Sequence, residues 1–334
     1  MNMRKWLADV QASATKKAMP ILSFPCVQLL GVSVKELTNN AALQAQGMKL
    51  IADRCDTLAA VSMMDLSVEA EAFGASVHFA ENEIPAVTGP LVTTPAEADA
   101  LVVPEITAGR CGLYADAIRQ ACALITDRPV FAGVIGPFSL AGRLMDVSEI
   151  MINCYDEPDM VHTVMAKSVA FLKKYILAYK EAGASGVVMA EPLTGMLSPA
   201  LAEEFSAPYV KELIDAVQSD DFIVIYHNCG NNTIRMADSI FSVGAAAYHF
   251  GNAISMKEML EIAPADVAVM GNVDPAGQLK NGTPASVAEE TKRIMTECAA
   301  YSNFIISSGC DIPHESPWEN LDAFFGAVQE FYSK

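Results

Sequence analysis

The run FIVIYH at residues 222–227 is continuously apolar up to its last residue, where His227 is followed by Asn228, Cys229 and Gly230. A short apolar run without polar alternation is typical of a parallel strand that other elements cover on both faces. Histidine and cysteine are the side chains that zinc prefers in proteins. The stretch therefore predicts a buried strand whose carboxyl end carries side chains able to bind metal.

Similar runs occur on both sides of it, separated by helical patterns. The other runs are ILSFPC (21–26), LAAVSM (58–63), VFAGVI (130–135), GVVMAE (186–191), AAAYHF (245–250), VAVMGN (267–272) and FIISSG (304–309). Between two of them, apolar residues recur every four positions along one helical stripe, at Leu201, Phe205, Tyr209, Leu213 and Val217. Eight strands alternating with helices predict an α/β fold, the (β/α)8 TIM barrel. The alternative is an open doubly wound sheet, but no Gly-rich dinucleotide fingerprint follows the first run.

Residues 75–104 interrupt the alternation of strands and helices. The segment holds two short β-like pieces with Pro and Gly between them, and we expect it to be an insertion on the second βα connection. No Ser/Gly-rich linker divides the chain and no internal repeat stands out. Residues 1–334 are therefore predicted to form a single TIM-barrel domain.

The amino-acid composition argues against several classes of protein. Of the 334 residues 52% are hydrophobic and 19% charged, which allows a large buried core. A net charge of −18 would repel a phosphate backbone and argues against nucleic acid as a partner. No apolar stretch is long enough to span a bilayer, and no apolar signal region precedes Lys16 and Lys17. Eight scattered cysteines fit free thiols, so we expect a cytoplasmic protein.

Three of the candidate metal ligands follow two different strands of the predicted barrel. The carboxyl ends of all barrel strands meet at one face, where the catalytic residues of such enzymes lie. His227 and Cys229 follow the fifth run and Cys310 follows the eighth, so their loops must lean over the barrel axis to meet. One imidazole and two thiolates leave one tetrahedral position of zinc open, as catalytic zinc requires. Such a zinc suits activation of a substrate thiol that attacks a methyl or other alkyl group.

Other polar side chains at the same face are weaker candidates. Glu191 ends the fourth run and is a candidate fourth metal ligand that an incoming thiol would displace. His249 ends the sixth run and is expected to orient a ligand or contact substrate. Asn272 and Asp274 follow the seventh run and are candidates for substrate binding, although Asp before Pro is also an ordinary turn. Glu71 is a candidate for the pocket, but its spacing also fits a solvated helix face.

At these residues the sequence resembles a known family. YHNCGNN (226–232) and SSGCDIPHESPWENLDAF (307–324) are similar to the His-x-Cys and distal Cys zinc motifs of the methylcobamide:coenzyme M methyltransferases, a branch of the uroporphyrinogen decarboxylase superfamily. Further segments resemble that group: DLSVEAEAFG (65–74), GVIGPFSLAGRLM (133–145), EPLTGMLSP (191–199), FSAPYVKEL (205–213) and GNVDP (271–275). The resemblance covers most of the chain from about Pro20 to the C-terminus, and the His-x-Cys with its distal Cys is its most specific part.

The resemblance implies a TIM barrel that carries one Zn²⁺ on His227, Cys229 and Cys310. It implies that the zinc binds a small thiol acceptor such as coenzyme M, and that a separate corrinoid protein presents a methylated corrinoid at the barrel mouth. Thiolate attack on that methyl group would break its bond to Co(III) and give a methyl thioether and a Co(I) corrinoid. Homocysteine fits the ligand set equally well, and related enzymes work in the demethylating direction or with tetrahydrofolate.

The sequence also departs from the decarboxylases of this superfamily. Those enzymes carry an arginine-bearing N-terminal motif that grips substrate carboxylates, whereas the matching region AMPILSFPCVQLLGVSV (18–34) contains no Arg. Asp65 nevertheless lies where the catalytic Asp of a decarboxylase would fall. A metal-free decarboxylase that uses Asp65 is therefore the alternative enzyme, and an accessory protein that binds zinc or corrinoid without turnover is a third hypothesis.

Overall fold

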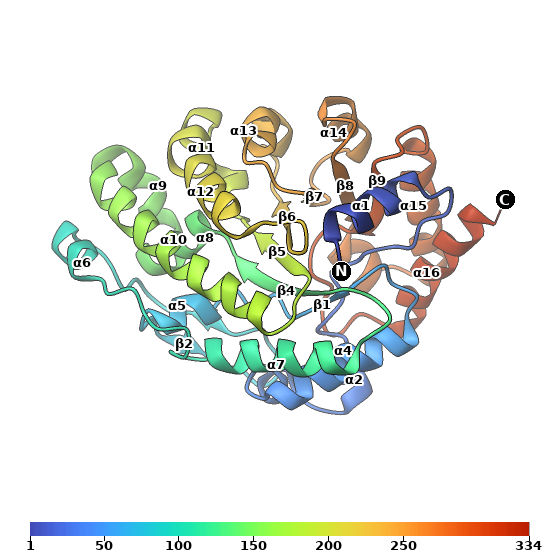
Figure 1. Cartoon of the computed structure of the whole chain (residues 1–334), viewed down its shortest axis with the longest axis horizontal. Coiled ribbons are helices and arrows are strands. Elements are labelled where there is room, and N and C mark those ends of the chain that lie inside the picture. The colour runs from blue at the N-terminus through green and yellow to red at the C-terminus, as the bar shows by residue number, and fades with distance from the viewer. Residues whose placement is uncertain (334) are drawn as a thin grey trace.

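The structure is a computed structural model and describes residues 1–333. Seven parallel strands form one curled sheet in the order β1-β4-β5-β6-β7-β8-β9, so that strand order follows chain order. Helices surround the sheet as in a half-barrel (Figure 1). The strands are β1 (Ala60–Val61), β4 (Val130–Ile135), β5 (Gly186–Ala190), β6 (Ile223–Asn228), β7 (Ala247–Phe250), β8 (Ala268–Val273) and β9 (Phe304–Ser308).

The helices connect these strands and cover the outer face of the sheet. They are α1 (Met3–Ala12), α2 (Cys26–Leu30), α3 (Val34–Thr38), α4 (Ala41–Arg54), α5 (Val68–Ala72), α6 (Pro95–Ala100), α7 (Cys111–Leu124), α8 (Pro137–Met145), α9 (Val147–Asp156), α10 (Pro158–Glu181), η1 (Thr194–Met196), α11 (Pro199–Phe205), α12 (Ala207–Val217), η2 (Thr233–Met236), α13 (Ala237–Ser242), α14 (Met256–Ile262), η3 (Pro275–Lys280), α15 (Pro284–Glu297) and α16 (Trp318–Tyr332). No helix among residues 1–333 is both long and apolar enough to cross a membrane.

Seven of the eight predicted strands are present, and the prediction of the first strand is wrong. Its residues, 21–26, form a turn that leads into α2, because Pro20 and Pro25 lack the N–H groups that a strand ladder needs. The preceding residues still lie between the first and last strands. The Leu58 N–H donates to the Ala18 carbonyl at 2.8 Å, and the Met19 N–H donates to the Ile306 carbonyl at 3.0 Å. An extended segment therefore occupies the place where an eighth strand would close a barrel.

The structure agrees in part with the helix predicted around residues 201–217 and with the description of residues 75–104. The predicted helix around residues 201–217 is divided into α11 and α12 at Ser206, two residues before Pro208. Residues 75–104 contain a short antiparallel hairpin of β2 (Val77–His78) and β3 (Ala86–Val87), followed by α6, on the connection between β1 and β4. That this segment is an insertion stays a prediction.

The inside of the curled sheet is filled by apolar side chains and closed at one end by α1. Ile223 and Ile225 of β6 pack in this inner cluster together with Met3 and Leu7 of α1. The ring of Trp6 lies 6.0 Å from that of Phe131, centroid to centroid. Because side chains alternate along a strand, the residue two positions after Ile225 also points inward. That residue, His227, lies at the opposite end from α1.

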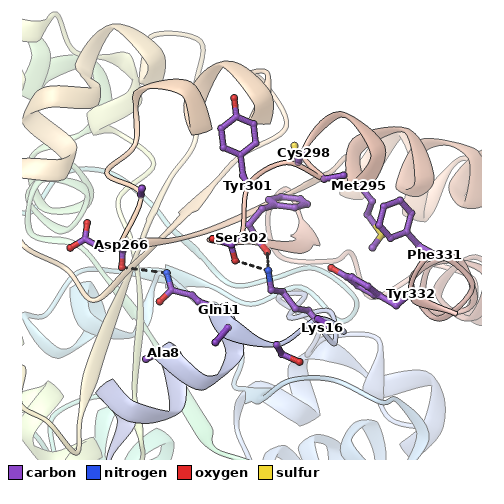
Figure 2. A pocket seen from close by; sticks show the side chains of 16 residues that line it. Ala8, Gln11, Lys16, Asp266, Met295, Cys298, Tyr301, Ser302, Phe331 and Tyr332 are labelled. Atoms are coloured by element: carbon purple, nitrogen blue, oxygen red, sulfur yellow. Dashed lines mark hydrogen bonds between the residues drawn. The ribbon is translucent and has the colours of Figure 1, made fainter. Parts of the chain in front are cut away.

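A cavity of about 630 Å³ lies at the end that α1 closes. Its walls come from α1, the segments before β8 and β9, and the ends of α15 and α16 (Figure 2). Within it, Lys16 Nζ donates to the Ser302 carbonyl at 2.6 Å and Gln11 Nε2 to the Asp266 carbonyl at 3.3 Å. These residues precede strands, whereas the predicted ligands follow them. The cavity therefore belongs to the face opposite the candidate site.

Candidate metal centre

Two histidines from neighbouring strands lie inside the carboxyl end of the sheet. His227 of β6 and His249 of β7 are paired in register. Both residues are buried, with 2% of each exposed. Their ring centroids are 4.8 Å apart. Side chains alternate between the two faces of a strand, and both histidines point to the inner face. Because they stand at paired positions on neighbouring parallel strands, their imidazoles come into contact.

The structure brings the three predicted ligands together at this end of the sheet. The Cys310 Sγ lies 3.7 Å from Nε2 of His227, although 83 residues separate them in the chain. The thiols of Cys229 and Cys310 form a hydrogen bond with each other. The loops that follow β6 and β9 therefore lean over the sheet axis, as the sequence-based hypothesis requires.

Glycine lets the loops approach one another so closely. A Cβ added to Gly251, which follows β7, would lie 2.6 Å from the Cβ of Cys229 and 3.4 Å from the carbonyl oxygen of Gly309. A Cβ added to Gly309 would lie 2.8 Å from the backbone nitrogen of Asn252. The contacts at 2.6 and 2.8 Å are too short for ordinary packing, so a side chain at either glycine would push the cysteine-bearing loops apart.

The distances between the candidate ligand atoms agree only in part with those in a zinc site. Zinc–sulfur bonds near 2.3 Å and zinc–nitrogen bonds near 2.0–2.1 Å at tetrahedral angles place ligand sulfur and nitrogen roughly 3.6 Å apart. The 3.7 Å between Cys310 and His227 agrees with that value. Within residues 1–333, no group of three or more His, Cys, Asp or Glu side chains is placed so that it could hold a metal ion. The zinc ligand set therefore stays a prediction.

The two thiols are inequivalent in this arrangement. The hydrogen bond with Cys310 lowers the pKa of the Cys229 thiol in spite of its burial. The same bond, together with burial, raises the pKa of Cys310 to about 12. The two shifts thus make Cys229 the thiol that is deprotonated more readily.

A chain of hydrogen bonds fixes the proton positions on the two imidazoles. A carbonyl can only accept, so the Ser307 hydroxyl must donate to the Met19 carbonyl at 2.7 Å. Ser307 Oγ then accepts from Nε2–H of His249 at 2.8 Å. Burial and the neighbouring His227 hold the pKa of His249 well below its usual range, so this ring is neutral and its Nδ1 carries a lone pair. That lone pair accepts from Nδ1–H of His227 at 2.7 Å.

The result is a defined tautomer of the candidate ligand. With its proton on Nδ1, His227 presents the lone pair of Nε2 toward Cys310, which is the form that binds a metal. The sequence predicts that His249 orients a ligand or contacts substrate; its ring bonds that of His227, and its role stays a prediction. Ser307 was not predicted, although it is a buried polar residue on a strand that begins with three apolar residues.

Glu191 holds a helix terminus. Its Oε1 accepts from the Ser139 N–H at 2.6 Å and its Oε2 from the Phe138 N–H at 3.0 Å, in the first turn of α8. Burial raises the pKa of this carboxyl to about 7. Both oxygens are therefore engaged by the start of α8, and the predicted role of Glu191 as a metal ligand stays a prediction.

Asp65 and Glu71 are held by one arginine. Arg110 Nη1 lies 2.5 Å from Asp65 Oδ2, and Arg110 Nε lies 2.6 Å from Glu71 Oε2. Asp65 Oδ2 also accepts from the Tyr114 hydroxyl at 2.8 Å, while its Oδ1 accepts from the backbone and hydroxyl of Ser67. The side chain of Asp65 is 0% exposed. Four donors saturate this carboxylate, so its geometry is that of a structural anchor.

The two candidates after the seventh predicted strand also bond to nearby backbone. Asn272 Nδ2 donates to the carbonyls of Gly251 at 3.0 Å and Ile254 at 2.9 Å, which holds the loop after β7. Asp274 Oδ1 accepts from two N–H groups in the first turn of η3, at 2.9 and 2.8 Å. Substrate contacts by Asn272, Asp274 and Glu71 stay predictions.

Comparison with known proteins places this geometry in a family. The family model described as uroporphyrinogen decarboxylase (URO-D) matches residues 14–331. A methylcobamide:CoM methyltransferase, MtbA, of Methanosarcina acetivorans is 27% identical over 276 residues, which cover 80% of this chain and 78% of that protein. A uroporphyrinogen decarboxylase of Chlorobium luteolum is 28% identical over 288 residues, which cover 83% of this chain and 80% of that protein.

A solved structure shows the same fold. It is described as a methyltransferase from Methanosarcina mazei and matches with a TM-score of 0.88 over 99% of this chain and 98% of that chain, at 22% identity. Methyltransferases and decarboxylases thus both occur among the relatives, at similar identity. The chain belongs to the uroporphyrinogen decarboxylase (URO-D) family, and its similarity to methylcobamide:CoM methyltransferases supports the branch that its sequence motifs indicate.

Proposed function

We propose that this protein is a zinc-dependent methyltransferase that moves a methyl group from a methylated corrinoid protein to a thiol acceptor such as coenzyme M. The observation that carries the proposal is the meeting of His227, Cys229 and Cys310 at the carboxyl end of the sheet. Relatives named as methylcobamide:CoM methyltransferases support the same reaction class.

The types of side chain present are those that a catalytic zinc site uses. When bound, zinc acts as a Lewis acid that keeps a substrate sulfur in its nucleophilic thiolate form near neutral pH. His227 would supply a neutral nitrogen from a ring whose orientation His249 fixes. Cys229 and Cys310 would supply two thiolates, which together balance the charge of a divalent cation. Three protein ligands leave a tetrahedral position for the acceptor.

The geometry of Asp65 favours methyl transfer over decarboxylation. A decarboxylase of the kind considered above would need this carboxylate to face its substrate. Here Asp65 is fully buried and bonded to Arg110, Tyr114 and Ser67. Its four hydrogen-bond donors all come from the protein, which supports a structural role for this carboxylate.

The test is metal content followed by methyl transfer. Purified protein should contain about one zinc per chain, and Cys229→Ser and Cys310→Ser should each lower zinc occupancy and methyl transfer strongly. Cys122→Ser is the matched control, since this free cysteine lies on α7, remote from the site in the fold, and should change neither. Methyl transfer is followed by the absorbance of methylcobalamin mixed with 2-mercaptoethanesulfonate. Zinc-free protein with full methyl transfer, or decarboxylation of uroporphyrinogen, would contradict the proposal.

A further inference from the structure

The cavity at the end that α1 closes has no part in the proposed reaction. Its volume of about 630 Å³ falls within the roughly 300–1,000 Å³ of pockets that bind small organic molecules. Its walls include residues that precede β8 and β9, whereas the candidate metal ligands lie at the carboxyl ends of β6 and β9. The two sites therefore lie at opposite ends of the sheet, and a molecule in this cavity would be a ligand separate from the thiol acceptor.

Part of the cavity is an aromatic wall formed by Tyr301, Phe331 and Tyr332 (Figure 2). Phe331 and Tyr332, at the end of α16, have ring centroids 5.4 Å apart and ring planes at 87° to each other. All three aromatic residues are half-buried, so each keeps a surface that a ligand can cover. The thioether of Met295 lines the same cavity. Aromatic faces and thioethers make favourable contacts with rings, so this wall favours a ligand that contains an aromatic ring.

Residues of α1 and of the turn after it contribute only short side chains. These residues are Ala8, Ala12, Ser13 and Ala14. Their side chains have one or two heavy atoms each, so they leave the volume of the cavity free. Ala12 is exposed at the end of α1, and a large side chain at this position would occupy part of the cavity.

The positive charge in the cavity belongs to Lys16. Among the lining residues only Lys16 is cationic and only Asp266 is anionic, and Asp266 is exposed to water. Lys16 Nζ donates to the carbonyls of Ser302 at 2.6 Å and Phe304 at 3.3 Å (Figure 2). Within residues 1–333 it forms no ion pair, whereas the adjacent Lys17 is paired with a carboxylate at 2.6 Å. An ammonium has three N–H donors, so Lys16 keeps one for a ligand.

An anion would complete the contacts of Lys16. Its two carbonyl acceptors are neutral, so the charge of this half-buried ammonium is not compensated by any carboxylate of the described residues. Burial accordingly lowers the pKa of Lys16. The Tyr332 hydroxyl has no hydrogen-bond partner among residues 1–333, and it turns toward the Lys16 side of the cavity (Figure 2). A carboxylate beside Lys16 would neutralise its charge, and Tyr332 offers a second donor.

We propose that this cavity is a binding site for a small aromatic carboxylate, whose negative group contacts Lys16 and whose ring lies on the aromatic wall. The inference does not depend on the proposed methyl transfer, because it uses other residues at the other end of the sheet. A neutral aromatic molecule would leave the charge of Lys16 uncompensated, and an anion without a ring would leave the aromatic wall uncovered. We therefore expect the site to prefer molecules that combine the two features.

The experiment compares two probes that share a ring system and differ in charge. They are 2-naphthoate and the neutral 2-naphthamide. Isothermal titration should show that the wild-type protein binds 2-naphthoate about 5-fold or more tightly than 2-naphthamide. Lys16→Met keeps an apolar stem and lacks the charge, so it should bind the two probes with equal affinity. Lys17→Met is the matched control, because Lys17 does not line this cavity, and it should keep the wild-type preference.

A second variant tests the cavity without altering Lys16. Ala12→Trp should lower the affinity for both probes by about 10-fold or more, because the indole occupies space that the ligand needs. Ala166→Trp places the same side chain at an exposed position of α10 that does not line the cavity, and it should bind both probes as wild type does.

The outcomes decide the proposal independently of the metal centre. Loss of the preference in Lys16→Met together with loss of affinity in Ala12→Trp supports the site, whether or not the protein transfers methyl groups. Equal wild-type affinity for the two probes, or no binding of either, overturns it. An unchanged preference in Lys16→Met, or full affinity in Ala12→Trp, overturns it as well, even if zinc binding and methyl transfer are found.

Discussion

The Nδ1 atoms of His227 and His249 lie 2.7 Å apart, so one of these two nitrogens must be protonated and the other must not. The direction of this hydrogen bond is set at the other end of the hydrogen-bonded chain, where the Met19 carbonyl accepts from the Ser307 hydroxyl. Met19 belongs to the segment that lies between β1 and β9. The closure of the sheet and the protonation of the candidate ligand are therefore linked through one hydrogen-bonded path.

Loss of the His249 acceptor should weaken metal binding. In His249→Phe the Nδ1–H of His227 loses its partner and the ring is free to turn or to move its proton, so the zinc dissociation constant should rise about 10- to 100-fold. His249→Gln retains a carbonyl acceptor and should lose less. Chelator competition measures the affinity, and nitrogen NMR of labelled histidines reports the His227 tautomer in metal-free protein.

The control for this prediction is a half-buried imidazole elsewhere in the chain, that of His162. His162 stacks on Phe205 with 4.7 Å between the ring centroids, and it bonds the hydroxyl of Tyr209 at 2.7 Å. His162→Phe should leave zinc affinity at the wild-type value. A wild-type tautomer signal together with wild-type zinc affinity in His249→Phe would show that the contact has no positioning role.

Local pattern predicted most of the strands, and it brought forward the three candidate ligands, because both depend on short stretches of sequence. The run at 130–135 coincides with β4 at both ends, and His227 and Cys229 come directly from one strand and its loop. The prediction of a strand at residues 21–26 was wrong because it followed the apolar pattern and gave too little weight to Pro20 and Pro25. The contacts of Ser307 depend on His249 and Met19, which lie far away in the chain. No spacing within the sequence shows such partners.

The buried carboxyl of Glu69 should make stability depend on pH. Its Oε1 accepts from the Ile135 N–H at 3.0 Å, whereas its Oε2 has no hydrogen-bond partner among the described residues. Burial raises the pKa of Glu69 from 4.5 to about 7. The native state thus holds this proton over a pH range in which the unfolded state has lost it. Its contribution is complete below about pH 4.5 and is lost as the pH rises through about 7.

Glu69→Gln tests this dependence, because glutamine keeps the acceptor and cannot ionise. The variant should be more stable than wild type by about 1–3 kcal/mol at pH 8, and this difference should shrink as the pH falls to 5. Urea unfolding at several pH values measures the free energy of unfolding. The exposed Glu81→Gln should show no such trend. A difference between Glu69→Gln and wild type that is constant with pH would contradict the raised pKa.

Arg110 should contribute to stability far more than an exposed arginine does. It holds the buried carboxylate of Asp65 at 2.5 Å and also bonds Glu71, so Arg110→Leu leaves Asp65 charged and unpaired. Removing one partner of a buried pair lowers the free energy of unfolding by about 3–5 kcal/mol. Arg119→Leu, which breaks an exposed pair with Asp116, should change it by about 0.5 kcal/mol or less. Similar effects of the two variants in urea unfolding would exclude a structural role for Asp65.

Gly251 should be required for the approach of the cysteine-bearing loops. The methyl group of Gly251→Ala would lie 2.6 Å from the Cβ of Cys229, and the loop must shift to relieve the contact. A displaced Cys229 would misplace one of the three zinc ligands, so zinc affinity should fall by about 10-fold or more, with a loss of stability of about 1–3 kcal/mol. Gly326→Ala in α16 is the matched control, because nothing lies within 4 Å of its added methyl group. Alanine favours a helix there, so stability should stay equal or rise slightly with zinc affinity unchanged. If Gly251→Ala retained full zinc affinity, the metal centre could not depend on the close packing of these loops.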